Sequence, residues 1–203
     1  MPLASDWELK PTLSWQHNLR RANRPGQPLS AGYDGTIHLE FDRYVAQLEA
    51  IHGPLGPLDG GTLGAEYSNK IQYSRGTTVL APGGEVSNLA LFAFERFAER
   101  GPIREPYLTL GMRHAAAKDA APGEPFAQFD QLPFGTASTE AYTLADLDLG
   151  FAFRAFGNRL ARVDLTVRNL FDTEYRDFLD TYKGYALSPG RDIRVSLSVP
   201  FGG

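Results

Sequence analysis

Apolar and polar residues alternate strictly along most of this chain, and this alternation limits its fold more than any other sequence feature. In the first run, residues 7–16, the apolar positions are Trp7, Leu9, Pro11, Leu13 and Trp15. Successive side chains of a β-strand point to opposite faces, so the run predicts a strand with one apolar and one polar face. Because proline cannot donate to a ladder, Pro11 indicates an edge or irregular position.

The same alternation recurs in about eight runs, which predicts an all-β fold of about eight antiparallel strands. The runs cover residues 7–16, 35–52, 63–73, 86–97, 107–113, 146–154, 161–168 and 192–201. Within 35–52 the parity of the apolar residues changes near Asp42 and Arg43, and we interpret this change as a β-bulge in one long strand.

Composition restricts the class of protein. The chain has 203 residues, 42% of them hydrophobic, with a net charge of -4 and no cysteine. It is long enough for one sizeable domain spanning 1–203, with 1–6 as an N-terminal tail and 202–203 as a C-terminal extension. We expect no disulfides and no nucleic-acid partner. The first residues lack the pattern of a signal peptide, and no apolar run is long enough for a membrane-spanning helix.

The predicted connections alternate between short and long. The short ones are 53–61, 98–104 and 157–158, and the long ones are 20–31, 75–84, 115–141 and 170–189. Short turns at one rim and long loops at the other are typical of outer-membrane β-barrels. We therefore expect an antiparallel up-and-down transmembrane barrel of about eight strands.

Alternation alone does not say which face meets solvent. A soluble lipocalin-like barrel would turn its apolar face inward around a small ligand, whereas a membrane barrel turns it toward lipid. The many charges of both signs on the polar parity favour the membrane barrel. Aromatic residues near the strand ends, where membrane-surface girdles lie, also favour it: Trp7, Trp15, Tyr73, Phe97, Tyr107, Tyr142 and Phe156. We expect the charges to form a polar network that pairs across the interior: Glu8, Lys10, Glu66, Lys70, Arg113, Asp148, Arg154, Arg162, Asp164, Arg168, Asp192 and Arg194.

No catalytic or metal-binding motif is evident. The four histidines are His17, His38, His52 and His114. They lack paired ligand spacing, although His17 and His114 fall toward the long-loop rim, where a metal-capturing receptor could use them. The chain has no nucleophile elbow and no phosphate-binding glycine loop. We expect no enzyme activity, no cofactor and no metal, and a structural role for the polar network.

An interrupted motif near the C-terminus resembles the C-terminal signature of TonB-dependent outer-membrane receptors. It comprises Asn169, Leu170, Phe171 and Asp172 with Tyr175, then Pro189, Gly190 and Arg191, and a terminal strand that ends in Phe201. Weaker likeness covers residues 61–114, in the stretches 89–95 and 108–113. The resemblance implies an outer-membrane location in a Gram-negative bacterium, lipid or detergent around the barrel, and contact with the barrel-assembly machinery during biogenesis.

The resemblance also implies a parent activity, the import of scarce nutrients, siderophores or metal chelates. Members of that family use a barrel of about 22 strands with a plugged lumen. No plug or partner-binding segment is recognisable here, so contact with TonB and energised transport are not expected. Our hypothesis is a shortened barrel, natural or engineered, with 115–140 near the join. A soluble ligand-binding barrel and a ligand-free membrane scaffold remain alternatives.

Overall fold

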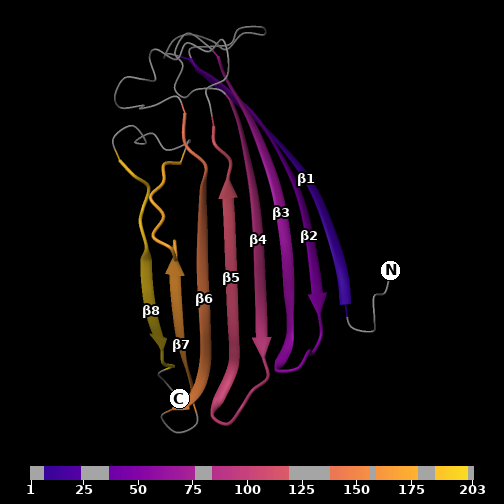
Figure 1. The fold of residues 1–203 in the computed structure, drawn as a ribbon, viewed down its shortest axis with the longest axis vertical. Coiled ribbons are helices and arrows are strands. Elements are labelled where there is room, and N and C mark those ends of the chain that lie inside the picture. The colour runs from indigo at the N-terminus through magenta and orange to yellow at the C-terminus, as the bar shows by residue number, and fades with distance from the viewer. Residues whose placement is uncertain are drawn as a thin grey trace.

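Eight antiparallel strands, each paired with its neighbours in sequence, form one sheet (Figure 1). The computed structural model describes residues 7–23, 37–75, 84–118, 138–155, 159–177 and 186–200. The strands are β1 (Trp7–Ala22), β2 (Ile37–His52), β3 (Leu58–Arg75), β4 (Gly84–Phe97), β5 (Ile103–Ala115), β6 (Tyr142–Ala155), β7 (Arg159–Arg168) and β8 (Asp192–Ser198). The all-β, up-and-down architecture predicted from alternation is confirmed.

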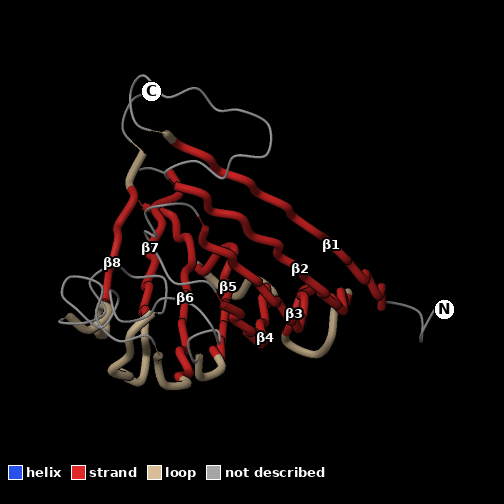
Figure 2. The backbone as a smooth tube through the Cα atoms, turned by 90° about the horizontal axis from the view of Figure 1, so that it is seen from above, coloured by secondary structure: helices blue, strands red, loops and turns tan. Residues whose placement is uncertain are grey.

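The sheet is curved but open (Figure 2). In the part of the chain that the structure describes, β1 pairs only with β2 and β8 pairs only with β7. Closure of the sheet into a barrel therefore stays a prediction. Pro11 lies in β1, opposite Leu48, so its indication of an edge strand is confirmed.

Short and long connections alternate from one end of the sheet to the other. The turns 53–57 and 98–102 are short and lie at the lower end in Figure 1, whereas 116–141 and 169–191 separate strands at the other end. Residues 157 and 158, the third predicted short turn, lie outside the described residues, as does Phe201. Within the described ranges there is no helix long and apolar enough to cross a membrane.

The predicted bulge at Asp42 and Arg43 is wrong. The ladders of β2 with β1 and with β3 run through both residues without a shift. The apolar residues change parity because different faces carry them in the two halves of the strand. Asp42 is on the same face as Tyr44, whereas Phe41 is on the other face and lies under Lys70. The register shifts that do occur are between Leu58 and Gly60 and between Arg104 and Tyr107.

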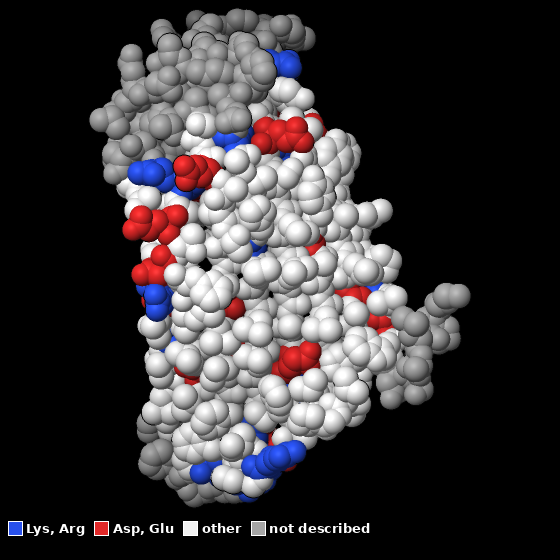
Figure 3. Space-filling model, in the orientation of Figure 1, with Lys and Arg blue, Asp and Glu red and all other residues white. Residues whose placement is uncertain are grey.

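The ladders gather one set of largely apolar side chains from every strand on one face, which we call the apolar face. In β4 this set contains Leu89, Leu91 and Ala93, whereas Phe92 and Phe94 lie on the opposite face. Side chains on this face are well exposed, including Leu13 at 83%, Val195 at 70% and Leu197 at 64%. The hydrophobic residues buried in the described part are few and mostly small: Ala115, Tyr142, Ala152, Ala161 and Val167. Figure 3 shows one face of the molecule, whose surface between its two ends is largely uncharged.

The opposite face, which we call the polar face, carries charged and hydroxyl side chains. Tyr107 of β5 reaches over Gly150 of β6 and donates a 2.9 Å hydrogen bond to Asp164 of β7. Arg162 also donates to Asp164, at 2.9 Å, and lies over the Tyr107 ring. A Cβ atom at Gly150 would overlap both Tyr107 and Asp164, so only glycine leaves room for this crossing. The sequence analysis placed Tyr107 among the rim aromatics, but it belongs to the polar face.

We predict that Gly150→Ala lowers the free energy of unfolding by about 1–3 kcal/mol, because the added methyl group displaces Tyr107 or Asp164. Gly111→Ala is the matched control, since it is also on the polar face and a Cβ there meets nothing within 4 Å. That control should change stability by less than about 0.5 kcal/mol. Urea unfolding of the folded chain measures both values, and equal losses would contradict the prediction.

Candidate functional site

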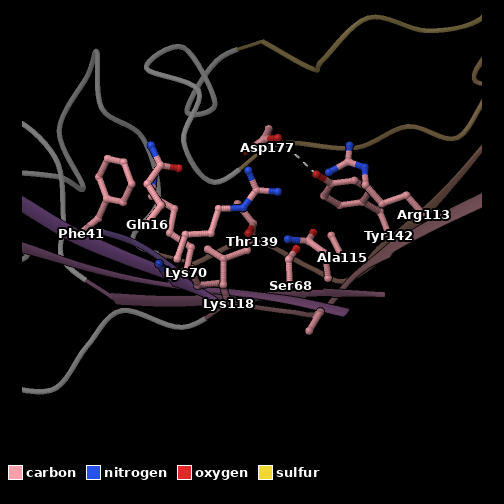
Figure 4. A pocket seen from close by; sticks show the side chains of 14 residues that line it. Gln16, Phe41, Ser68, Lys70, Arg113, Ala115, Lys118, Thr139, Tyr142 and Asp177 are labelled. Atoms are coloured by element: carbon pink, nitrogen blue, oxygen red, sulfur yellow. Dashed lines mark hydrogen bonds between the residues drawn. The ribbon is translucent and has the colours of Figure 1, made fainter. Parts of the chain in front are cut away.

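A cavity of about 300 Å³ opens on the polar face, toward the end of the sheet with the long connections. Because residues of the polar parity line it, the polar face is the concave side of the curved sheet. Figure 4 shows its side chains converging from the strands and from the segment that carries Asp177. The lining includes Phe41, Arg43, Lys70, Arg113, Lys118, Tyr142 and Asp177.

Cations dominate the cavity. Arg43 of β2 and Lys70 of β3 are directly opposite each other in the ladder, an arrangement in which like charges repel. Arg113 and Lys118 add two further cations, and Lys118 is 3% exposed. Among the described lining residues there is one carboxylate, Asp177.

Carboxylates near the cavity only partly balance these charges. Glu66 Oε1 lies 3.9 Å from Arg43 Nη2, at the outer limit of an ion pair. In the part of the chain that the structure describes, two carboxylates, Glu66 and Asp177, lie near the cations Arg43, Lys70 and Arg113. Such a concentration of positive charge in a concave site favours an anionic ligand.

Aromatic rings support two of the cations. Lys70 Nζ lies 4.4 Å from the centroid of the Phe41 ring, and the Arg113 guanidinium lies 5.5 Å from that of Tyr142. The Tyr142 hydroxyl also donates a 3.3 Å hydrogen bond to Asp177 Oδ2, the dashed line in Figure 4. Cation–π contacts hold the ends of long side chains in place, which reduces the entropy lost when a ligand binds.

The segment that brings Asp177 to the cavity begins with the predicted C-terminal motif. Asn169 has a φ of 50°, and its side chain both accepts from Thr173 N at 2.8 Å and donates to Thr173 O at 2.9 Å. The backbone N–H of Asn169 donates to Asp146 Oδ1 at 2.9 Å, which fixes the turn to β6. The motif therefore closes a tight loop immediately after β7.

The two halves of the motif contact each other. Arg191 N donates to Asp172 Oδ1 at 2.8 Å, and Gly190 lies against the same carboxylate. Further along, the Tyr175 ring lies against the ring of Tyr142, with centroids 4.6 Å apart. These contacts tie the motif to β6 and so position Asp177 beside Tyr142. Phe171 points outward and is exposed, near the apolar side chains of β4 and β5.

The predicted polar network lies on one face, and the ion pairs found among the described residues join neighbouring side chains. The ion pairs are Lys10–Glu49 at 3.3 Å, Arg43–Glu66 at 3.9 Å, Arg162–Asp164 at 2.9 Å, Arg162–Glu105 at 3.5 Å, Arg168–Asp148 at 2.8 Å and Arg194–Asp192 at 3.4 Å. Each joins residues of one strand, of adjacent strands, or of β5 and β7. Glu8 and Arg154 share this face. Only Lys70 and Arg113 of the predicted set line the cavity.

The sequence analysis did not assign five of these cavity residues to a site: Phe41, Arg43, Lys118, Tyr142 and Asp177. The sequence analysis expected a bulge at Arg43 and so did not assign this side chain to a face. In the uninterrupted strand, Arg43 is on the same face as Phe41. Tyr142 was assigned to a membrane-surface girdle. Lys118 and Asp177 belong to connections, whose path over the sheet no alternation pattern reveals.

The four histidines do not meet at one site. His114 Nδ1 lies 2.9 Å from Thr143 Oγ1, and His52 Nε2 lies 3.0 Å from Glu95 Oε2. His52 is at the end of β2, beyond the apolar residues of the strand; its bond to the Gly53 carbonyl, with help from Glu95, raises its pKa against the effect of burial. His17 and His38 lie at the other end of the sheet.

No protein-family model, curated protein or solved structure matches this chain.

We predict that Asn169→Ala lowers the free energy of unfolding by about 2–4 kcal/mol, because alanine is strained at this φ and makes neither bond to Thr173. Asn169→Gly tolerates the φ and loses only the hydrogen bonds, so it should cost about 1–2 kcal/mol. Unfolding titrations of both variants separate backbone strain from hydrogen bonding. A smaller loss for alanine than for glycine would contradict this account.

Proposed function

We propose that this chain forms the wall of a transmembrane β-barrel in the outer membrane of a Gram-negative bacterium and is related to TonB-dependent receptors. The observation that carries the proposal is the outward exposure of the apolar face. Leucine, valine and isoleucine side chains cover that face over seven ladders, while the charges gather on the concave side. A water-soluble protein buries such residues, whereas a lipid-embedded barrel turns them outward.

The same observation argues against the soluble lipocalin-like alternative. A lipocalin-like barrel needs its apolar side chains around an enclosed pocket. Here Val195 and Leu197 are on the exposed face, and the cavity on the other face is lined by cations and aromatic rings. The large apolar surface would aggregate in water unless lipid, detergent or protein covered it.

The two open edges of the sheet are also informative. Unpaired strand edges do not occur in the hydrocarbon of a bilayer, because every backbone N–H and C=O there needs a partner. In a membrane, β1 and β8 would therefore pair with each other or with additional strands. The barrel-assembly machinery is the expected partner during that closure.

The cavity favours a receptor over a ligand-free scaffold. Arg43 and Lys70 repel each other in the absence of a ligand, and an anion between them would relieve that repulsion. We propose that the site accepts a small anionic solute of the kind imported by nutrient receptors. Binding of that solute needs no energised transport, which this chain is not expected to perform.

We predict opposite results for arginine substitutions at two neighbouring residues of β8. Val195→Arg places a charge on the apolar face and should cost about 2–4 kcal/mol in lipid vesicles, because it faces hydrocarbon. Ser196→Arg places it on the polar face and should cost little. Both residues are exposed, so a soluble protein would tolerate both. Equal, small losses in vesicles would therefore contradict membrane insertion.

We predict that the double variant Arg43→Gln/Lys70→Gln binds pyrophosphate, used as an anionic probe, at least about tenfold more weakly than the unaltered chain. Arg194→Gln is the control, since Arg194 lies on the same face but outside the cavity. Added salt should weaken binding to the unaltered chain through screening. Calorimetry in detergent measures the affinities, and equal affinity for all three proteins would contradict an anion site.

A further inference from the structure

Three metal-ligating side chains meet on the apolar face, toward the end with the long connections. His17 of β1 is directly opposite Asp42 of β2, and Glu40 is two residues before Asp42 on the same face. One ligand atom from each side chain lies within 4.8 Å of the other two. The cluster is at the edge of the sheet, away from the cavity described above.

The distances are close to those of a metal centre. His17 Nδ1 and Asp42 Oδ1 are 3.1 Å apart. Two ligands that each lie about 2.1 Å from one ion at a tetrahedral angle are about 3.4 Å apart. Glu40 offers the third ligand atom within 4.8 Å of the other two, at the end of a flexible two-carbon stem.

Neighbouring side chains already orient the two carboxylates. Trp15 Nε1 donates a 2.9 Å hydrogen bond to Asp42 Oδ1. His38 is 2% exposed, and its Nε2 lies 3.5 Å from Glu40 Oε2. Such outer contacts are a regular part of metal sites, since they fix the direction of each ligand atom.

The charge of the cluster fits a cation. Two of the three ligand side chains, Glu40 and Asp42, are carboxylates, which attract cations. Within the described residues, the ion pairs of Asp42 and Glu40 are with His17 and His38, and not with lysine or arginine.

We propose that His17, Glu40 and Asp42 bind one divalent transition-metal ion, Zn²⁺ by preference, which fastens the edge strand β1 to β2. One imidazole nitrogen and two carboxylate oxygens suit Zn²⁺, whereas Ca²⁺ and Mg²⁺ favour oxygen ligands alone. Water completes the coordination. The site is separate from the anion cavity, because its residues are on the opposite face of the sheet.

Such an ion would stabilise the part of the sheet that has fewest neighbours. β1 pairs on one side only, and nearly all of its side chains are exposed. The unfolded chain does not hold the three ligands in this geometry. An ion bound by both β1 and β2 therefore favours the paired state by mass action. The metal therefore has a structural role, as a clip across the first ladder.

The test is a Zn²⁺ titration of the full chain, folded in detergent micelles or in buffer if it proves soluble. We expect one ion per chain, and affinity at least about tenfold lower for each of His17→Ala, Glu40→Gln and Asp42→Asn. His114→Ala is the control, because His114 is on the same face and bonded to Thr143. No Zn²⁺ binding at millimolar concentration, or equal binding by all four variants, overturns the proposal, as does equal competition by Ca²⁺.

A second measurement places the ion. Trp7 and Trp15 are the two tryptophans, so Trp7→Phe leaves Trp15, beside Asp42, as the reporter. Paramagnetic Co²⁺ should quench Trp15 emission in Trp7→Phe and not in Trp7→Phe/His17→Ala. Circular dichroism checks that both variants keep their strands. Equal quenching in two folded variants would place the ion elsewhere and overturn the site.

Discussion

A register that is kept along seven strand pairs, apart from shifts beside two short turns, is the constraint on which the rest of this structure depends. A slip of one residue in any ladder would exchange the two faces of a strand and put arginines beside leucines. The two register shifts that do occur, at Leu58/Gly60 and Arg104/Tyr107, lie next to the short turns at the start of a strand. The face assignment therefore holds through the length of the sheet.

Glycine makes the polar face more than a row of local ion pairs. Where Gly150 removes a side chain, Tyr107 reaches Asp164 two strands away. On the apolar face Gly61 has the same position between His52 and Glu95, whose side chains meet at 3.0 Å. Each crossing couples three strands through one contact. Ladder hydrogen bonds alone couple only two.

The cavity depends on the same register and on one loop. Register puts Arg43 opposite Lys70, and the Asn169–Asp172 turn brings Asp177 to Tyr142. The motif that suggested a family resemblance thus has a physical role in this chain, since it anchors a connection over the concave face.

The sequence by itself determined the strand content, the antiparallel order and the two faces, because a two-residue period and turn residues are local properties. It also marked β1 as an edge through Pro11. Only the tertiary structure decided that the sheet is open, that Tyr107 and Tyr142 turn to the polar face, and that His17 meets Glu40 and Asp42. These features depend on which residues become opposite each other across a ladder. That choice is made by pairing residues far apart in the chain, so alternation within one strand cannot reveal it.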